Sequence, residues 1–292
     1  NNRVEICSGS AKYTLAAMDP TDFPTIALSR ENAVELDIPV SDLLTLLSVN
    51  YAAAQDLVSQ PSLYGVRLMV RQGRLASLGM DGKRLAITSV PLPLGVAELN
   101  NIMFPADTVK ELCRILGDLE EDSVHLSLGQ TAQLNTEIFR LTFTMVGHES
   151  TDAQAFRERT QAGLEGMLTK LNGATISVHP AVLKSALNRA SVVYAQGLES
   201  YEPAVVETTD SGLTLSLGNE GSHHAVEEVE GATADVGKRF RLYRTFFQDA
   251  LHQFPEDGEI DIHYVDVGRP LVFTSKKRPE TVHLISPITG KQ

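Results

Sequence analysis

The sequence predicts an α+β protein built from repeated βαβββ modules, in which pairs of helices pack on antiparallel sheets. Two observations support this class. One amphipathic helical pattern occurs four times, and several strand-like runs follow each copy. Taking Pro39, Pro105, Pro180 and Tyr243 as markers, the copies are 66, 75 and 63 residues apart. A period that long has room for one helix and several strands, so each repeat is expected to be one supersecondary unit.

The helical pattern is clearest in FPADTVKELCRILG, residues 104–117. Pro105 suits the first turn of a helix, where its missing N–H would have no partner anyway. Val109, Leu112, Cys113 and Leu116 recur at the spacing of one helix face, which predicts an apolar stripe. Gly117 can adopt the left-handed conformation that ends a helix. The other copies are IPVSDLLTLLSV (38–49), HPAVLKSALNRASVV (179–193) and LYRTFFQDALHQF (242–254).

Length and composition narrow the kinds of protein that this chain can be. A chain of 292 residues has room for two domains, and 42% hydrophobic with 21% charged residues is typical of a soluble globular protein. Apolar runs fall short of the roughly 18 residues of a membrane span. Cys7 and Cys113 are expected to be reduced core residues, which favours the cytoplasm. The net charge of −12 argues against a basic surface, but it leaves room for a local basic face that binds nucleic acid.

The strand-like runs divide the chain. Residues 1–30 read as a terminal hairpin with an exit turn, since two prolines interrupt the stretch DPTDFP. Residues 31–149 and 173–292 are each predicted to form one domain of two modules. Asp81-Gly82 is a strong hairpin signal between two strands of the first domain. Expected strands of the first domain are 34–38, 64–70, 74–80, 84–90, 123–128, 131–135 and 139–146. Expected strands of the second are 174–178, 204–208, 213–217, 225–229, 239–241, 259–265, 271–275 and 282–285.

Residues 150–172 differ from both neighbours, because they are polar, poor in β-branched residues and compatible with a helix. We interpret them as an interdomain linker.

Catalytic and metal sites have little support. His223 and His224 are adjacent, and adjacent strand residues point to opposite faces, which is wrong for joint ligation. A G-x-S-x-G motif and a phosphate-binding glycine loop are both absent from the sequence. The pairs Glu120-Glu121 and Glu227-Glu228 are read as surface charge. We therefore expect no catalytic residue, no metal and no cofactor.

Basic residues lie off the apolar stripe on three of the four helices. If the helices face one side of a curved sheet layer, these residues would form a sparse positive lining that contacts phosphates without reading base sequence. An ordinary solvated helix face is the alternative, and the first helix carries Asp42 but no Lys or Arg. The candidate DNA-facing residues are Lys110, Arg114, Lys184, Arg189 and Arg244.

At several motifs the chain resembles the bacterial sliding clamp, the β subunit of DNA polymerase III. KYTLAAMDPTDFP (12–24) resembles the end of that family's first domain. LYGVRLMVRQGRLASLGMDGKRLAITSVPLP (63–93) resembles its second domain, including the T-D-G-H-R-L-A-like turn that reads MDGKRLA here. VHLISPITGKQ (282–292) resembles its terminal strand and tail. The resemblance covers nearly the whole chain but begins late in the first domain, so most of that domain is expected to be missing.

The resemblance implies a DNA-clamp fold and a non-catalytic processivity factor of DNA replication. In this family two three-domain subunits form a homodimeric ring that encircles duplex DNA, with helices lining the hole and sheets outside. A clamp loader opens the ring, and the polymerase and other partners insert a short peptide into a cleft between domains two and three. The implied cleft residues are Leu63, Met80, Gly82, Lys83, Arg84 and Leu85 on one wall, and Pro270, Leu271, Leu284, Ser286 and Pro287 on the other.

For the leucines of this set, plain core packing remains the alternative. The long linker and Ser286, which replaces a usual methionine, imply an altered cleft. Because the first domain is largely missing, a clamp-fold adaptor that binds peptides without encircling DNA is a second reading. An enzyme on this scaffold is a remote third.

Overall fold

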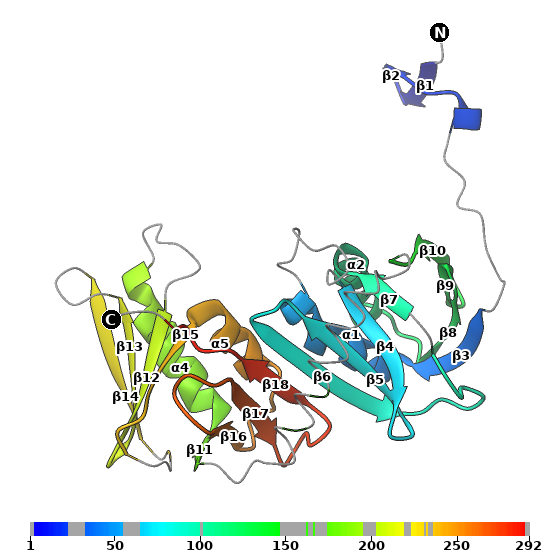
Figure 1. Cartoon of the computed structure of the whole chain (residues 1–292). Coiled ribbons are helices and arrows are strands. Elements are labelled where there is room, and N and C mark those ends of the chain that lie inside the picture. The colour runs from blue at the N-terminus through cyan, green and yellow to red at the C-terminus, as the bar shows by residue number, and fades with distance from the viewer. Residues whose placement is uncertain are drawn as a thin grey trace.

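A computed structural model describes residues 3–22, 33–54, 65–99, 102–146, 162, 166, 174–194, 203–218, 223–230, 232 and 236–289. The described chain forms a terminal hairpin and two α+β units (Figure 1). Each unit contains two βαβββ modules, as the repeated pattern predicts.

The hairpin consists of β1 (Arg3–Ser8) and β2 (Ala11–Ala16), and the short 3-10 helix η1 (Pro20–Asp22) follows. The first unit contains β3 (Val34–Pro39), α1 (Val40–Ala54), β4 (Gly65–Arg71), β5 (Arg74–Met80), β6 (Arg84–Pro91), β7 (Ile102–Pro105), α2 (Ala106–Gly117), β8 (Ser123–Leu128), β9 (Thr131–Asn135) and β10 (Arg140–Thr144). The second contains β11 (Ala174–Val178), α4 (Pro180–Ala190), the 3-10 helix η3 (Ser191–Tyr194), β12 (Pro203–Thr209), β13 (Gly212–Gly218), β14 (His224–Glu230), β15 (Arg239–Tyr243), α5 (Arg244–His252), β16 (Ile260–Tyr264), β17 (Leu271–Ser275) and β18 (Val282–Ile285).

All strand pairs of the units are antiparallel, and they form three sheets. A four-stranded sheet has the order β10-β9-β8-β3, and another has the order β14-β13-β12-β15. The third has eight strands in the order β11-β16-β17-β18-β6-β5-β4-β7. It is shared by both units, because β18 of the second unit pairs with β6 of the first. We call this eight-stranded sheet the joint sheet.

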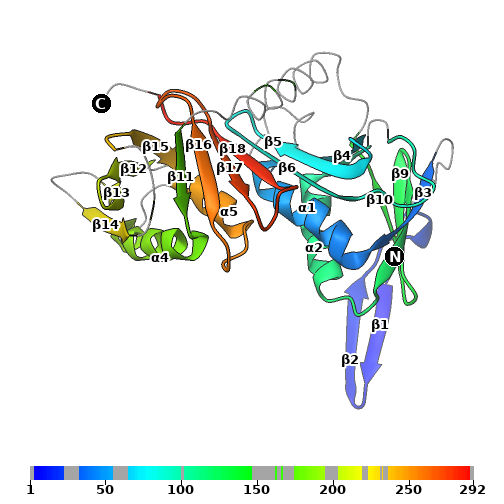
Figure 2. The same ribbon diagram turned by 90° about the horizontal axis from the view of Figure 1, so that it is seen from below.

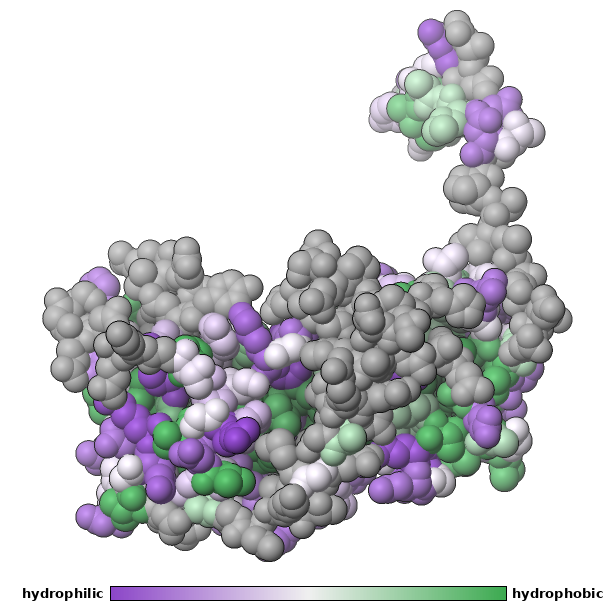
Figure 3. Space-filling model, viewed as in Figure 1, coloured by the Kyte–Doolittle hydropathy of each residue, from purple (hydrophilic) through white to green (hydrophobic). Residues whose placement is uncertain are grey.

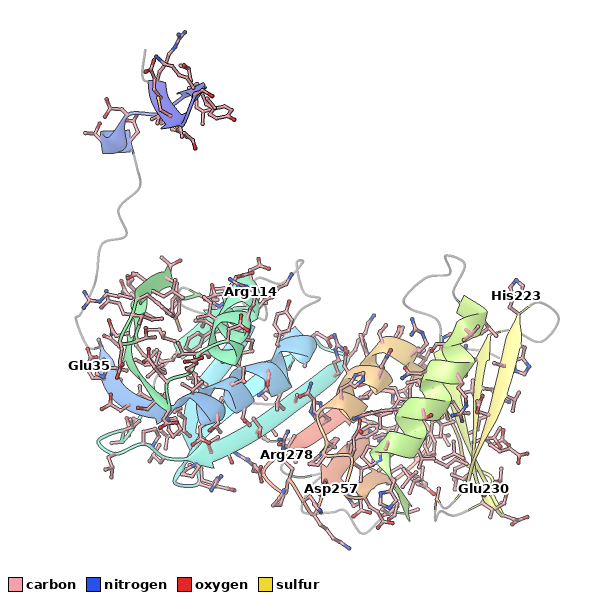
Figure 4. All side chains as sticks on the ribbon, turned by 180° about the vertical axis from the view of Figure 1, so that it is seen from behind. Glu35, Arg114, His223, Glu230, Asp257 and Arg278 are labelled. Carbon is pink, nitrogen blue, oxygen red and sulfur yellow. The ribbon has the colours of Figure 1, made fainter. Side chains whose placement is uncertain are left out.

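The helices form one layer and the strands another, as the two views in Figure 2 and Figure 4 show. The helices follow one another in the order α2, α1, α5, α4, with contacts between each neighbouring pair. Their apolar stripes are buried against the sheets; α2 contributes Val109, Leu112 and Leu116. One hydrophobic core lies between helices and sheets in each unit. The amphipathic spacing of each helix therefore determines which face meets the sheet.

Most predicted elements are confirmed, with three corrections. Gly117 does not adopt the left-handed conformation predicted for it, because α2 includes this residue and its C-cap is Asp118. The strand β7 was missed, because its last residues Phe104 and Pro105 read as the start of the following helix. That strand completes the second module of the first unit. Cys7 is exposed on the hairpin, so its prediction as a core residue was wrong, whereas Cys113 is partly buried. Burial raises the pKa of the Cys113 thiol to about 11.

Both faces of the terminal hairpin are exposed. One of these faces is apolar, because Val4 pairs with Leu15 and Ile6 pairs with Tyr13 across the two strands. All four side chains are about half exposed. Hydrophobic residues gather on the face of the hairpin that Figure 3 shows. A two-stranded hairpin does not bury a core by itself.

Candidate functional site

The junction between the two units is the predicted site region. Pairing of β18 with β6 runs from Val282 opposite Ile87 to Ile285 opposite Arg84. Beyond the strand, the amide of Ser286 donates to the carbonyl of Lys83 at 2.8 Å. The amide of Ile288 then donates to the carbonyl of Arg241 at 2.7 Å. Main-chain bonds thus hold the chain's C-terminal segment between β6 and β15.

The predicted hairpin turn after β5 builds one wall of this region. Gly82 has a positive φ of 82°, which explains why glycine stands there. Asp81 Oδ1 accepts hydrogen bonds at 2.9 Å from the amides of both Lys83 and Arg84. An Asp side chain that closes its own turn in this way favours one backbone geometry. The turn therefore aims the Lys83 and Arg84 side chains at the second unit.

Arg84 connects the units through a buried guanidinium. Its Nε donates to Asp81 Oδ2 at 2.8 Å, and its Nη1 donates to Asp249 Oδ2 on α5 at 2.7 Å. The guanidinium carbon lies 3.9 Å from the centre of the Phe246 ring. Next to it, Lys83 Nζ lies 4.6 Å from the centre of the Tyr243 ring. The second unit therefore offers carboxylate and aromatic partners to both cations of the turn.

His283 on β18 is a buried polar group close to Arg84. Its Nε2 is buried and has no hydrogen-bond partner among the residues that the structure describes, and its ring packs edge-on against Phe254. Burial, with a smaller contribution from the Arg84 charge, lowers the pKa of His283 to about 3. The imidazole is therefore neutral at physiological pH and acts as a packing group in the junction.

A separate hydrophobic cluster lies on the joint sheet, distinct from the two helix-side cores. On β5, Ser77 bonds to α1 and the backbone of Gly79 abuts Asn50 of α1. Since strand residues alternate between faces, Leu78 and Met80 point away from the helices. We call this cluster the outer patch. Its members are Met69, Ala76, Leu78, Met80, Leu85, Ile87, Val272 and Val282, with the partly buried Leu284 packed against them.

The predicted cleft residues differ in burial and position. Met80, Arg84 and Leu85 are buried in the junction, and Leu271 belongs to the core of the second unit. Gly82 and Lys83 are exposed, while Pro270, Leu284, Ser286 and Pro287 are half-buried. Leu63 lies outside the described residues. The turn, Leu284 and Ser286 are thus brought together from 200 residues apart, whereas Leu271 faces the helix-side core.

The predicted DNA-facing residues lie on the helix layer, and several have acidic partners. Lys184 Nζ is 3.1 Å from Glu256, and Arg189 Nη2 is 2.7 Å from Glu227 on β14. Arg114 Nε contacts Glu111 at 3.1 Å (Figure 4 labels Arg114). Lys110 is exposed, and Arg244 is half-buried. The helix layer therefore carries cations, but acidic side chains offset part of their charge.

Sequence reasoning missed a polar pocket on the β10-β9-β8-β3 sheet. The pocket has a volume of about 320 Å³. His125 Nδ1 is 2.8 Å from Asp37 and its Nε2 is 2.9 Å from Glu35, which also accepts from Ser127 at 2.7 Å. Hydrogen bonding to Asp37 is the main cause that raises the pKa of His125. Only the strand register of β3 and β8 brings these residues together, so no local motif could show them.

Among the residues that the structure describes, no three His, Cys, Asp or Glu side chains converge to hold a metal ion. His224 begins β14, which is the outer strand of its sheet among the described strands. Within the same described ranges, no helix has the length and hydropathy needed to cross a membrane.

Comparison with known proteins agrees with this architecture. Residues 38–147 match the family described as DNA polymerase III beta subunit, central domain. The chain is 23% identical over 286 residues to the beta sliding clamp of Staphylococcus aureus (strain Mu50 / ATCC 700699), covering 97% of this chain and 71% of the relative. It is 24% identical over 295 residues to the beta sliding clamp of Halalkalibacterium halodurans, and the match covers 97% of this chain and 72% of that relative.

Solved structures show the same fold. The DNA polymerase III subunit beta from Pseudomonas aeruginosa matches with a TM-score of 0.78 at 20% identity, over 99% of this chain and 74% of that one. The sliding clamp from Bartonella birtlesii bound to griselimycin matches with a TM-score of 0.79 at 18% identity, over 98% of this chain and 74% of that one. The β subunit is a non-catalytic part of the polymerase. Residues 38–147 thus match the central domain of the DNA polymerase III β-subunit family, and nearly the whole chain has the fold of the solved sliding clamps.

Proposed function

We propose that the chain acts in a DNA sliding clamp that encircles duplex DNA and tethers the polymerase through a peptide cleft at the junction. The continuous joint sheet carries this proposal, because it holds two clamp units side by side, with the described helices α1, α2, α4 and α5 forming one layer. Helices lining a hole would present their cations to phosphates without reading sequence. Such a replication factor would work in the cytoplasm, where the free thiols Cys7 and Cys113 stay reduced.

The ring requires further clamp units, and two sheet edges are suited to receive them. The last strands of the four described modules are β6, β10, β14 and β18. β6 and β18 pair with each other, which joins the strands of their two modules into the joint sheet. The corresponding strands β10 and β14 have no partner on their outer side among the described strands. Unpaired backbone groups along a strand favour the addition of another strand. We propose that these edges pair with strands of further clamp units.

The peptide cleft would use the exposed turn at Gly82 and Lys83, the half-buried Leu284, and Ser286 with Pro287. Leu and Phe anchors of a partner would supply most of the binding energy, and the clamp loader would use the same cleft. Fluorescence anisotropy with a labelled Gln-Leu-x-Leu-Phe peptide tests this proposal. Saturable binding should be lost when residues 286–292 are removed and when the peptide's Leu and Phe become Ala. Equal binding of both peptides would show that no specific cleft exists.

An adaptor that binds peptides without encircling DNA is the second candidate. The ion pairs of Lys184 with Glu256 and of Arg189 with Glu227 favour it, because they offset charges that would face DNA. A clamp should bind linear duplex weakly, with affinity that falls steeply as salt rises.

Charge substitutions distinguish the two candidates. Lys110→Gln with Arg114→Gln should lower retention on duplex DNA at low salt severalfold if the helix layer faces DNA. Glu227→Gln, which releases Arg189, should raise it. If neither change alters DNA retention while the peptide still binds, the adaptor is the correct function.

A further inference from the structure

We propose that the polar pocket on the β10-β9-β8-β3 sheet binds a free basic amino acid, arginine or lysine, through its α-carboxylate and α-ammonium groups. The pocket lies on the face of this sheet that points away from the helices, because Leu126 and Leu134 of the same strands belong to the helix-side core. A ligand bound there touches neither the helix layer nor the junction, so binding does not require the clamp function.

The strand register arranges polar side chains on this face in two neighbouring rows, each of which crosses all four strands. From β10 to β3, one row is Arg140, Asn135, His125 and Asp37, and the other is Thr142, Gln133, Ser127 and Glu35. Each row therefore begins on one outermost strand of the sheet and ends on the other.

The side of the pocket formed by β10 and β9 has hydrogen-bond donors to spare. Arg140 Nε donates to Asn135 Oδ1 at 2.7 Å. Within the described ranges, the two terminal nitrogens of this exposed guanidinium and the Asn135 amide nitrogen have no acceptor. A guanidinium presents its N–H groups as a planar fork that binds a carboxylate through two parallel hydrogen bonds. This side of the pocket therefore suits the α-carboxylate of a ligand.

The side formed by β8 and β3 has acceptors to spare. Glu35, which Figure 4 labels, accepts from Ser127 Oγ at 2.7 Å, and its other carboxylate oxygen lies 2.9 Å from His125 Nε2. An ionised carboxylate has about four acceptor positions, so about two remain. A ligand can reach them, because the Glu35 side chain is 49% exposed. This side of the pocket therefore suits the α-ammonium group.

The two sides do not bond to each other. Asn135 lies opposite His125 and Gln133 lies opposite Ser127 in the strand ladder, yet no side-chain hydrogen bond between described residues links either pair. The pocket, about 320 Å³ in volume, lies over this seam between β9 and β8. Its lining residues are Glu35, His125, Ser127, Gln133, Asn135 and Arg140. A ligand in the seam would supply the hydrogen bonds that the two sides do not make.

Arg140 and Glu35 bring opposite charges to this pocket without neutralising each other. They belong to the outermost strands, which are three strand spacings or roughly 14 Å apart, and no ion pair between described residues joins them. Each head group leans toward the middle of the sheet, Arg140 onto Asn135 of β9 and Glu35 onto Ser127 of β8. The two charges thus lie on either side of the seam, where the two charged groups of one α-amino acid can reach both.

A groove next to the pocket favours a basic side chain on that amino acid. It has a volume of about 970 Å³ and shares His125 and Asn135 with the pocket. No lysine or arginine is among its described lining residues, whose carboxylates are Asp37, Asp118, Glu120, Glu121, Asp122 and Glu137. A side chain that extends from the pocket into this groove meets negative potential. The pocket specifies the amino-acid group, and the groove adds only the preference for a cationic side chain.

Ligand analogues test each part of this assignment. L-Arginine should shift the NMR signals of the His125 ring saturably, and isothermal titration calorimetry should give the same dissociation constant. Agmatine lacks the α-carboxylate and Nα-acetylarginine lacks the α-ammonium group, so each should bind about tenfold or more weakly than arginine. L-Glutamate should also bind more weakly. If arginine binds no more tightly than agmatine or acetylarginine, the amino-acid site is overturned. If glutamate binds as tightly as arginine, the preference for a basic side chain is overturned.

Two variants locate the binding at the pocket. Arg140→Gln and Glu35→Gln should each weaken arginine binding about tenfold or more, because each removes one charged partner. Arg140→Gln should leave agmatine binding unchanged, since agmatine has no carboxylate to lose. Arg239→Gln is the matched control: it removes an exposed arginine from β15 in the other four-stranded sheet and should bind arginine like the unaltered chain. Unchanged arginine binding by Arg140→Gln, or an equal loss for arginine and agmatine, would overturn the proposal.

Discussion

Arg84 Nη1 on β6 lies 2.7 Å from Asp249 Oδ2 on α5, so one guanidinium joins the two clamp units. The same side chain is held by Asp81 and stacks on Phe246. Arg84 and Asp81 are almost fully buried, whereas the Asp249 side chain is 41% exposed. Because the exposures differ, we expect substitution of Arg84 and substitution of Asp249 to lower the free energy of unfolding by different amounts.

Arg84→Ala should lower the free energy of unfolding by about 3–5 kcal/mol, because it leaves the buried Asp81 carboxylate without its counter-charge. Asp249→Asn should lower the free energy of unfolding by about 1 kcal/mol or less, because the Asp249 side chain is partly exposed and water already screens its ion pair with Arg84. Urea denaturation followed by circular dichroism measures both values. Equal costs for the two substitutions would show that Arg84 is not the central group of the junction.

His283 should make the protein less stable in mild acid. Its folded-state pKa of about 3 is depressed below the unfolded value, so its contribution to stability is complete above about pH 6.5 and is lost as pH falls toward 3. The slope contributed by this one group can reach about 1.4 kcal/mol per pH unit. His283→Phe removes the titrating group but keeps a ring beside Phe254. Stability curves from pH 7 to pH 4 should therefore be shallower for this variant, and identical slopes would contradict the assignment.

His125 should titrate in the opposite direction. Hydrogen bonds to Asp37 and Glu35 raise its pKa, so its contribution to stability is complete below about pH 6.5 and is lost as pH rises through the folded-state pKa. An imidazole can donate from both nitrogens only when it is protonated. NMR titration of the ring protons should show a larger pKa drop for Asp37→Asn than for Glu35→Gln. The reverse order would assign the main hydrogen bond to Glu35.

Gly79 should resist substitution, because an added Cβ would collide with the backbone carbonyl of Asn50 on α1. Gly79→Ala must push α1 away from β5, and we expect it to cost about 3 kcal/mol. Gly117→Ala is the control: its Cβ meets nothing within 4 Å, and its φ is not positive. That change should be neutral or should stabilise by up to about 1 kcal/mol. Thermal unfolding of the two variants compares these effects, and a tolerated Gly79→Ala would contradict the close packing.

Local sequence patterns were enough to predict the repeat, its four amphipathic helices and nearly all strand positions. Those features depend on local spacing: apolar residues three and four apart on α2, and Asp81-Gly82 between β5 and β6. β7 escaped detection because a four-residue strand ending in Pro105 has too few residues to show its own period. Short-range patterns specify local structure, but they do not specify which strands become neighbours.

Which residues meet at the junction and in the polar pocket depends on tertiary packing and could not be predicted from local patterns. Strand pairing between β6 and β18 set Arg84 against Asp249 and formed the outer patch from both units. The register of β3 with β8 placed His125 between two carboxylates. Residues that far apart in sequence meet because burying apolar faces fixes sheet register, and a shift of one residue would turn every side chain to the other face. For the same reason, folding decided which predicted cleft leucines lie at the junction and which belong to the core.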